Sequence, residues 1–391
     1  MERRYDLDWL RVIAFALLIF YHIGMFFVPW GWHIKNNIIY EWVEYPMLFL
    51  NRWRMPLLFI ISGMGTAFSL GKRSAFKFST ERISRLFIPL LFGILVIVPP
   101  QVYIERIAHL QFMGSYLDYW PSHAFKGEYP TGNLSWHHLW FLPYILVYSL
   151  LLLPIFTYVR KHPNNKLIRI IKKLTQTRFG LYWMILPLLL MECFLDPFFP
   201  TTHSLFDDWF NFFYNLTLFF YGFLLITAQK LFFETIQKYY KTYLLTGIIA
   251  FSVFLYLISN FEDGYKRHFI EAFFNQINMW SWLLAIFGLS SVFLNRKSNI
   301  ILYCNRAIYP FYILHQTVII ILAYWIMNLN WSLLTKFTAL VIGTFSICWI
   351  LYEFLIKRVF LLNIVMGVKP KRKLLNIESI KNENYLNSGS E

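Results

Sequence analysis

The sequence predicts an all-α integral membrane protein with about ten transmembrane helices and both termini on the cytoplasmic side. Of its 391 residues, 58% are hydrophobic, 21% are aromatic and only 15% are charged, whereas a soluble domain carries about 25% charged residues. The apolar residues form long runs that short clusters of Lys and Arg separate, as in multi-pass membrane proteins. The net charge of +15 therefore reflects loop topology and does not indicate a nucleic-acid partner.

Ten apolar runs of the chain are candidate membrane spans. An even number places both termini on one face, and most of the 36 Lys and Arg residues then fall in cytoplasmic segments, as the positive-inside rule expects. The outer segments near 106–137 and 196–208 are instead rich in acidic and aromatic residues, which fits either a carbohydrate ligand or an interfacial aromatic belt. The expected spans lie near 9–28, 45–70, 85–105, 138–159, 180–197, 209–228, 243–260, 270–294, 306–328 and 332–356.

The chain divides into one membrane domain and a polar tail. Residues 1–365 contain all the apolar runs, and residues 366–391 turn basic and then mixed polar, which predicts a disordered cytoplasmic tail. The first run lacks a small-residue cleavage site and is long enough to span, so we expect a retained helix and not a signal peptide. The three cysteines lie in or beside apolar runs, which favours buried thiols over disulfides or a metal site.

The first span carries two ionisable groups inside an apolar run. Arg11 lies near its start and His22 lies eleven residues later, a separation of roughly 16 Å along a helix. Such groups are costly in a bilayer and usually face a protein interior or a wet cavity. A single histidine on an apolar face is more often a hydrogen-bonded core residue, but the pairing with Arg11 favours a functional His22. Asp8, one turn before Arg11, is expected to orient the guanidinium.

Two arginines enter the third span together. Arg82 and Arg85 are three residues apart and therefore share one helix face. Two guanidiniums on one face can bind a phosphate in a bidentate manner that Lys cannot match. Plain positive-inside anchoring explains the same residues without any ligand, and the spacing alone leaves both interpretations open.

A further arginine lies at an unusual position in the second span. Arg54 falls toward the outer end of this span, against the positive-inside bias. It predicts an anionic partner, which is either a substrate group or one of the upstream residues Glu41 and Glu44. Ser62 and the glycine after it permit a close helix approach, a packing role that needs no chemistry.

The remaining candidates lie in the fourth, ninth and tenth spans. Trp140 follows two adjacent histidines at the outer mouth of the fourth span, where no acidic or thiol ligands cluster, so we expect no metal site. His315 lies just after a proline that is expected to kink the ninth span and bring the imidazole near the core. Glu353 lies near the end of the tenth span and is expected to pair with Arg358 or with an inner loop.

Taken together, these motifs resemble the membrane acyltransferase family 3, and the resemblance covers roughly residues 5–365. The family has an arginine followed after ten residues by a histidine, a paired-arginine motif, an aromatic–Ser–Gly motif and a late Tyr-Ile-Leu-His stretch. In this sequence the motifs fall, in that order, on Arg11 and His22, on Arg82 and Arg85, on Phe59, Ser62 and Gly63, and on Tyr312 to His315. Within the family, the stretches DLDWLRVIAF and RMPLLFIISG resemble members associated with succinylation of osmoregulated periplasmic glucans.

The resemblance implies an acyl-CoA-dependent O-acyltransferase in the bacterial inner membrane. Such an enzyme moves a succinyl or acetyl group from cytoplasmic acyl-CoA to a hydroxyl of an extracytoplasmic glycan, for example a periplasmic glucan. His22 is then the general base, and acyl-CoA is a co-substrate; no tightly bound cofactor, metal or nucleic acid is expected. The residues expected to bind acyl-CoA are Arg11, Arg82 and Arg85, and those expected to support the site or bind substrate are Asp8, Arg54, Ser62, Trp140, His315 and Glu353. Among these, Arg54 is assigned to a succinyl carboxylate.

The alternative from another class is a transporter or flippase that moves a lipid or acylated sugar without forming bonds. Ionisable residues inside the spans suit such a protein. However, the chain shows no matching halves with interrupted segments, and the arginine clamp lies on one side only. The extramembrane parts are too small for a signalling domain, which disfavours a sensor or scaffold. The preferred acyl group, the acceptor hydroxyl and the oligomeric state stay open.

Overall fold

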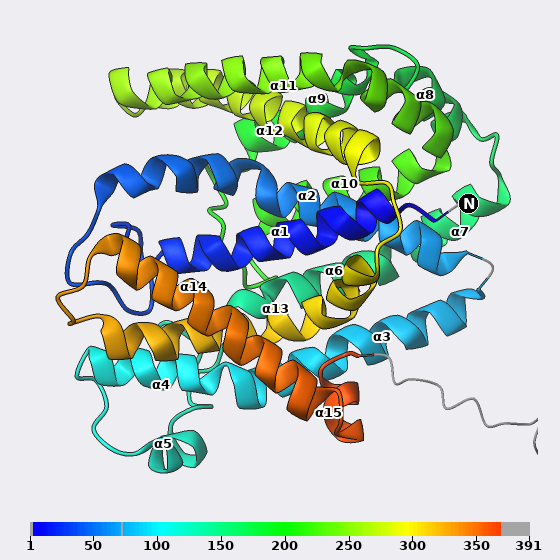
Figure 1. The fold of residues 1–391 in the computed structure, drawn as a ribbon. Coiled ribbons are helices and arrows are strands. Elements are labelled where there is room, and N and C mark those ends of the chain that lie inside the picture. Colours follow the sequence, from blue (N-terminus) through cyan, green and yellow to red (C-terminus); the bar gives the residue numbers. More distant parts are fainter. Residues whose placement is uncertain (1–2, 72, 369–391) are drawn as a thin grey trace, which may run out of the picture.

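The computed structural model describes residues 3–71 and 73–368, and these residues form an all-helical protein without β-strands (Figure 1). The predicted fold class is therefore confirmed in its helical content. The expected disordered tail lies outside the described residues from position 369 onward. The α-helices are α1 Tyr5–Gly24, α2 Glu44–Leu70, α3 Ala75–Phe92, α4 Pro99–Ala108, α5 Tyr116–Ser122, α6 Phe141–Leu151, α7 Leu153–Lys161, α8 Lys166–Leu174, α9 Ile185–Phe194, α10 Trp209–Thr227, α11 Gln229–Asn260, α12 Tyr265–Phe293, α13 Asn299–Ile326, α14 Leu333–Ile350 and α15 Phe360–Val365. Short 3-10 segments precede α2, α6 and α9 at Glu41–Val43, His137–Trp140 and Gly180–Met184, and π-helical segments occur at Gly93–Ile97 and Leu351–Ile356.

Seven helices in the described part of the chain are long and apolar enough to cross a membrane. The segment His137–Leu151 with α7 forms an eighth candidate, bent by 49°. The other two expected spans are helical as well, but α2 carries two arginines and the apolar segment Gly180–Phe194 is short. Length and composition thus support a multi-pass membrane protein with seven or eight spans, fewer than the ten predicted.

The first helix begins earlier than predicted, because α1 spans Tyr5–Gly24 and not 9–28. Its acidic first turn accounts for the early start, since Asp6 and Asp8 favour a helix N-terminus. The chain after Gly24 remains buried at Phe26 and Phe27 although it is not helical. His22 consequently lies in the last turn of α1.

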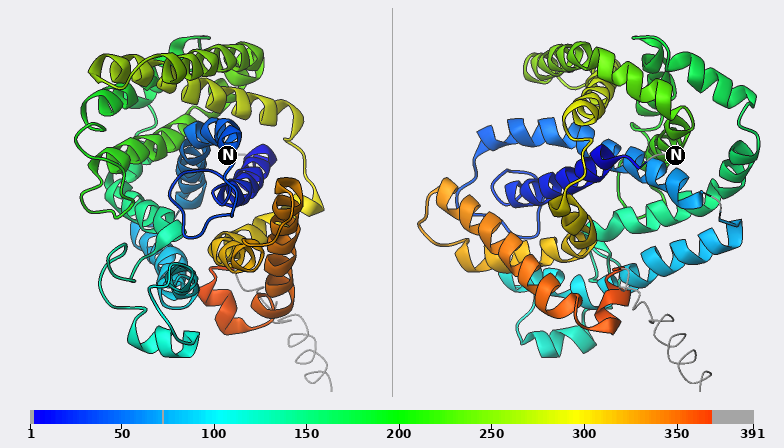
Figure 2. Two further views of the ribbon diagram at one scale, coloured as in Figure 1. Left: turned by 90° about the vertical axis from the view of Figure 1, so that its left-hand side faces the viewer. Right: turned by 45° about the vertical axis from the view of Figure 1, so that its right-hand side comes forward.

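The helices α1 and α2 lie near the middle of the molecule, and the other helices surround them (Figure 2). The pair α11 and α12 packs along one side, and α13 and α14 pack against α1 on another (Figure 1). The contact of α2 with α10 is unusually close: a Cβ on Gly63 would collide with the Phe219 carbonyl oxygen, and one on Gly222 with the Ile60 carbonyl oxygen. The expected role of the glycine after Ser62 in close helix approach matches this contact.

A π-helical segment, Gly93–Ile97, joins α3 to α4. Such a segment leaves backbone groups without their usual helical partners and often occurs at functional sites. Here the carbonyl oxygen of Ile97 accepts a hydrogen bond of 2.7 Å from the Thr317 hydroxyl on α13. The irregular segment therefore links α4 to the part of α13 that carries His315.

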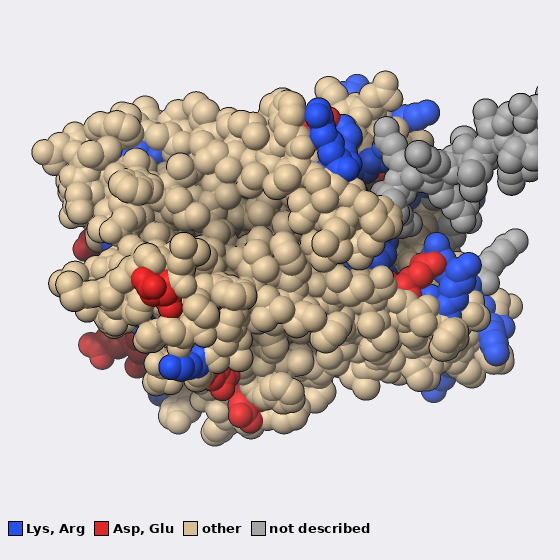
Figure 3. Space-filling model, turned by 90° about the horizontal axis from the view of Figure 1, so that it is seen from below, with Lys and Arg blue, Asp and Glu red and all other residues tan. Residues whose placement is uncertain are grey.

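Charged side chains are distributed unequally along the molecule. Most of the Lys and Arg side chains on the face in Figure 3 gather toward the end where the N-terminus lies in Figure 1, and a larger group of acidic side chains lies toward the opposite end. We name these the basic end and the acidic end. The loop 25–40 and α5 lie at the acidic end.

Candidate functional site

Two histidines from helices far apart in the sequence meet inside the helical bundle. The Nδ1 atom of His22 on α1 lies 2.9 Å from the Nε2 atom of His315 on α13. Their rings are nearly parallel, with an interplanar angle of 7° and centroids 5.0 Å apart. The structure thus brings together two candidate residues that are 293 positions apart in the sequence.

The hydrogen bonds of His315 fix the proton positions of both rings. The Nδ1 atom of His315 lies 2.7 Å from the Tyr312 carbonyl oxygen and 3.2 Å from that of Phe311. A carbonyl oxygen only accepts, so Nδ1 carries the proton and Nε2 of the neutral ring is an acceptor. His22 must then donate from its own Nδ1 atom. This assignment leaves the Nε2 atom of His22 with a free lone pair, the state that a general base requires.

A buried polar network lies beside this histidine pair. His138 donates from Nε2 to the Ile313 carbonyl oxygen at 3.0 Å, and its ring centroid lies 5.1 Å from that of His315. The amide of Gln101 on α4 donates to the Thr317 hydroxyl at 2.7 Å, and Gln316 donates to the Gln101 side-chain oxygen at 3.1 Å. Such fully connected polar side chains hold a core in one arrangement.

The network continues to the acidic end through His33 and Glu105. Gln316 also donates to the Nε2 atom of His33 at 3.2 Å, and the Nδ1 atom of His33 donates to the Glu105 carboxylate. Sequence reasoning missed these residues. The available signal was the polar pair Gln101 and Glu105, four residues apart at the end of an apolar run and therefore on one helix face.

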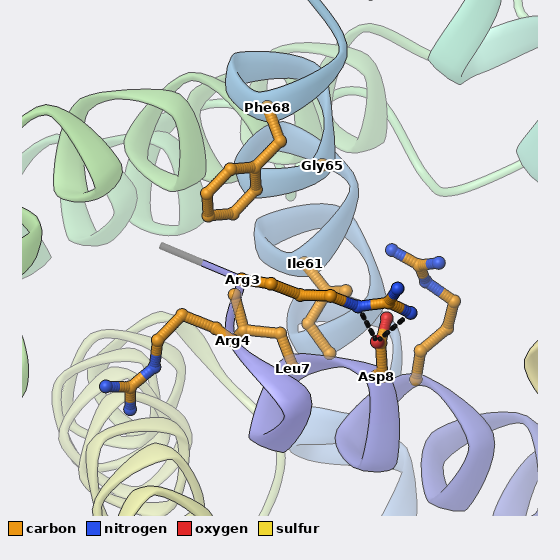
Figure 4. A pocket seen from close by; sticks show the side chains of 8 residues that line it. Arg3, Arg4, Leu7, Asp8, Ile61, Gly65 and Phe68 are labelled. Carbon is orange, nitrogen blue, oxygen red and sulfur yellow. Dashed lines mark hydrogen bonds and ion pairs between the residues drawn. The ribbon is translucent and has the colours of Figure 1, made fainter. Parts of the chain in front are cut away.

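A pocket of about 370 Å³ opens at the basic end between α1 and α2. Figure 4 shows Arg3 and Asp8 facing each other across it, and the Arg3 guanidinium donates to the Asp8 carboxylate at 3.0 Å. Arg11 lies beside the floor, with an Nη atom 3.5 Å from where a Cβ on Gly65 would be. Asp8 was expected to orient Arg11. In the structure it pairs with Arg3 instead. The residues that line the pocket are Arg3, Arg4, Leu7, Asp8, Arg11, Ile61, Gly65 and Phe68.

The paired arginines of α3 lie near the same region. Arg82 donates from Nη2 to the Thr66 hydroxyl at 2.9 Å, and Thr66 donates to the Ser62 carbonyl oxygen at 2.9 Å. Arg85 is exposed. Arg11 lies beside Gly65, the residue before Thr66, so Arg11 and the paired arginines of α3 lie close together. Ser62 thus takes part through its backbone, and the three arginines form one cationic region next to the pocket.

Arg54 is a buried cation on α2 with few partners. Its side chain is only 4% exposed, and its guanidinium lies over the Tyr21 ring at 3.5 Å from the centroid. Its Nε and Nη1 atoms are buried and find no hydrogen-bond partner among the described residues. Within the described residues, Arg54 forms no ion pair with Glu41 or Glu44. A buried charge without a partner is costly, so an anionic group placed here would stabilise this guanidinium.

Two other candidates are placed differently. Trp140 packs against the imidazole of His203 with ring centroids 4.1 Å apart, and it also contacts Phe59 of α2. Glu353 pairs with Lys357 and accepts a hydrogen bond of 3.0 Å from Tyr303, not from Arg358. Tyr303 is twelve residues before His315 on α13, about 18 Å along the helix. The structure therefore does not bring Glu353 to His22.

Histidine and acidic side chains of the described residues do not form a group of three that suits a metal ion. The titratable side chains around the histidine pair and the pocket are imidazoles, guanidiniums and the carboxylates of Asp8 and Glu105. This set of groups suits proton transfer next to an anion-binding region.

Comparison with known proteins identifies one family and several relatives. Residues 4–353 match the family described as "Acyltransferase domain". Relatives named "Glucans biosynthesis protein C" from Salmonella paratyphi B, Salmonella agona and Salmonella dublin are each 24% identical over 379 residues, which cover 95% of this chain and 96% of the relative. No solved structure matches the chain.

Proposed function

This chain belongs to the acyltransferase 3 family, and from that premise we propose that it is an acyl-CoA-dependent O-acyltransferase of a glycan. The coarser statement, a multi-pass membrane acyltransferase, follows from the family and the apolar helices. The proposed reaction moves a succinyl or acetyl group from cytoplasmic acyl-CoA to a hydroxyl of an extracytoplasmic glycan such as a periplasmic glucan. The name of the relatives supports a glucan as the acceptor.

The observation that carries the proposal is the His22–His315 pair. The hydrogen bond to His315 directs the lone pair of His22 to Nε2. The same helix, α1, carries Arg11 at the pocket of the basic end. One rigid element thus connects an anion-binding region with a free imidazole base.

The arginines would hold the phosphates of the acyl donor. Arg11, Arg82 and Arg85 form one cationic region, and guanidiniums bind phosphate through paired charge-assisted hydrogen bonds. Arg3 and Arg4 add cations at the pocket rim. In this arrangement Asp8 supports the site by holding Arg3.

The transfer itself needs one base that later acts as an acid. The Nε2 atom of His22 takes the proton of the acceptor hydroxyl while its oxygen attacks the thioester carbonyl. The tetrahedral intermediate then collapses, the carbon–sulfur bond breaks, and the His22 imidazolium returns the proton to the CoA thiolate. The products are the glycan ester and free CoA. His315 positions His22 throughout and does not itself touch the substrate.

Arg54 would bind the terminal carboxylate of a succinyl group. Its two unpartnered nitrogen atoms and its deep burial support this assignment. Its guanidinium lies over the ring of Tyr21, whose centroid is 6.0 Å from that of His22, so it lies near the reacting region. Trp140 packs near Phe59, and Phe59 lies on the same helix as Arg54. Trp140 would therefore support this side of the site.

We further propose the arrangement in the membrane. Ten spans result when α2 and the segment Gly180–Phe194 cross together with the eight candidates identified by length and composition. The basic end then faces the cytoplasm of the bacterial inner membrane with both termini. Residues 1–365 form the catalytic domain and residues 366–391 a separate tail.

Purified protein in nanodiscs tests the proposal. We would add acetyl-CoA or succinyl-CoA and follow free CoA with and without a glucose oligosaccharide as acceptor. The expected result is acceptor-dependent CoA release that His22→Ala abolishes and that the exposed control His162→Ala retains. Normal CoA binding by His22→Ala separates a catalytic from a structural role. Absence of both CoA release and CoA binding in the wild-type protein would instead favour the transporter.

A further inference from the structure

Five aromatic rings form a continuous row from the proposed base to the acidic end. The ring centroids are separated by 5.4 Å from His22 to Trp32, by 5.1 Å from Trp32 to His33, by 4.6 Å from His33 to His137, and by 4.6 Å from His137 to Tyr129. We name these five residues the aromatic row. The helix α1 supplies His22, and the loop 25–40 supplies Trp32 and His33. The outer segment 106–137 supplies Tyr129 and His137.

The aromatic row carries polar atoms that lack partners. The indole nitrogen of Trp32 and the Nε2 atom of His137 are buried, and neither makes a hydrogen bond within residues 3–71 and 73–368. A buried polar atom of this kind costs stability unless something pairs with it. Trp32 is the second ring of the row and His137 is the fourth. A ligand that covers the row would therefore lie beside both atoms.

A buried carboxylate flanks the same rings. Glu105 accepts a hydrogen bond from His33 and another from the Tyr129 hydroxyl at 3.2 Å. Burial and the nearby Glu105 raise the pKa of Tyr129 to about 12, so its hydroxyl stays protonated and donates. The aromatic row thus combines flat ring faces with fixed hydrogen-bonding groups.

The backbone at His137, the fourth ring of the row, is held in an unfavourable conformation. His137 has a φ of 38°, in the left-handed region that non-glycine residues rarely adopt. Strain of this kind persists only where the surrounding structure imposes it, and it clusters at binding sites. Here the strain presents the His137 ring edge-on to both His33 and Tyr129, with interplanar angles of 83° and 76°.

Three cationic side chains hold the two loops that supply the row. Lys35 donates to the Met25 and Val28 carbonyl oxygens at 2.7 and 2.6 Å, and the buried Lys336 on α14 donates to the Asn36 side chain at 2.6 Å. Arg106 donates to the Pro130 and Gly132 carbonyl oxygens at 2.7 and 2.8 Å. The row is therefore built from loops that are fixed before any ligand arrives, which lowers the entropic cost of binding.

We propose that the aromatic row is the acceptor subsite, where an uncharged sugar ring packs on Trp32 and is hydrogen-bonded by the Trp32 indole and His137. The inference rests on the proposed function, because it names the residues that deliver the acceptor hydroxyl to His22. An apolar acyl chain does not fit as the occupant, since it would leave the Trp32 indole nitrogen and the Nε2 atom of His137 unpaired. A sugar offers both apolar C–H faces and hydroxyls, which match aromatic faces with polar atoms.

Steady-state kinetics on the full chain in nanodiscs tests the subsite. The acceptor is a neutral glucose oligosaccharide, and the donor is whichever acyl-CoA the wild-type protein uses. Trp32→Leu and His137→Phe should each raise the KM for the oligosaccharide at least tenfold and leave the KM for acyl-CoA within twofold. Trp32→Phe, which keeps a ring and removes only the N–H donor, should raise the acceptor KM by a smaller factor. Trp325→Leu, at a 73% exposed position on α13, is the matched control and should change neither constant.

The outcomes distinguish the subsite from the proposed function. Wild-type transfer with unchanged acceptor KM in Trp32→Leu and His137→Phe overturns the subsite and leaves the acyltransferase intact. Equal increases of donor and acceptor KM in the three row variants indicate a general structural defect, and they also overturn it. Absence of any transfer by the wild-type protein, with both donors, overturns the proposed function and the subsite with it.

Discussion

The Nδ1 atom of His22 and the Nε2 atom of His315 share a hydrogen bond of 2.9 Å. His315 is itself held by two backbone carbonyl oxygens of its own helix. The orientation of the base on α1 is consequently set by the backbone of α13. In the proposed mechanism His315 would therefore be a positioning residue, and this role differs measurably from that of a packing residue.

Replacement of His315 should reduce turnover according to whether an acceptor remains for His22. His315→Leu removes the acceptor and should lower kcat by about 10²–10⁴-fold, the range of general base catalysis. His315→Gln retains a side-chain oxygen and should recover a large part of this loss. Turnover measured as CoA release across pH 6–9 checks both variants. Equal activity of the Leu and Gln variants would assign His315 to packing alone.

Replacement of Arg82 should weaken donor binding. Arg82→Lys keeps the charge but loses the forked guanidinium and its hydrogen bond to Thr66. A charge-assisted hydrogen bond contributes about 1.5–3 kcal/mol, so the KM for acyl-CoA should rise by about 10–100-fold with a smaller change in kcat. Arg169→Lys on the exposed face of α8 provides the control. A phosphate role for Arg82 would be refuted by an unchanged KM.

Arg54 should determine which acyl group is accepted. Arg54→Met removes the buried guanidinium and preserves much of the side-chain volume. We expect a loss of kcat/KM of at least tenfold for succinyl-CoA and little change for acetyl-CoA, because only the succinyl group carries a carboxylate. Parallel assays with the two donors check this difference. A similar loss with both donors would point to stabilisation of the thioester oxyanion instead.

The glycines at the α2–α10 contact should be required for stability. Gly63→Ala places a methyl group against the Phe219 carbonyl oxygen, which neither backbone can avoid without moving apart. Overpacking of this kind costs about 1–3 kcal/mol, so the midpoint of thermal unfolding in detergent should fall by several degrees. Gly31→Ala is the control, because no atom lies within 4 Å of the added Cβ. Equal unfolding midpoints for the two variants would contradict the close contact.

Acidification should destabilise the loop that precedes α10. Burial lowers the pKa of His203 to about 4, below its ordinary value of 6.5. The unfolded chain therefore binds more protons between these values, and the stabilising contribution of the neutral ring is lost as the pH falls from 6.5 toward 4. Hydrogen exchange of residues 201–208 at pH 7.5 and 5 should show faster exchange, after correction for the intrinsic rate, at the lower pH. His203→Phe should remove much of this difference, and an unaltered difference would assign it to another group.

The sequence contained enough information for the fold class and for the residues that match family motifs. Arg11, His22, Arg82 and His315 were found because cations and imidazoles in apolar runs are rare and costly. The partnership of His22 with His315 could not be predicted, because no local pattern links residues 293 positions apart. Glu353 was included for the same reason as the others, but its i,i+4 partner Lys357 explains it without a ligand.

Two residues of the aromatic row that the prediction did not assign to the site lie in a loop and at a helix end. Trp32 and His137 belong to segments whose path depends on tertiary contacts such as those of Lys336 and Arg106. The start of α1 was also placed too late, because a hydropathy window gives little weight to the polar first turn at Asp6 and Asp8. Length and composition identify seven or eight of the ten predicted spans, because α2 carries two arginines and the segment Gly180–Phe194 is short.

The continuity of α1 has a further consequence for the choice of substrate carrier. Arg11 at the pocket and His22 at the base belong to one unbroken helix, whose rise fixes their separation at roughly 16 Å. In the proposed function the helix would therefore set the distance that the flexible arm between the phosphates and the thioester of a donor has to span. Under the proposed function the donor would have to carry an arm of this length, and a truncated thioester without the full arm would reach either the arginines or the base but not both.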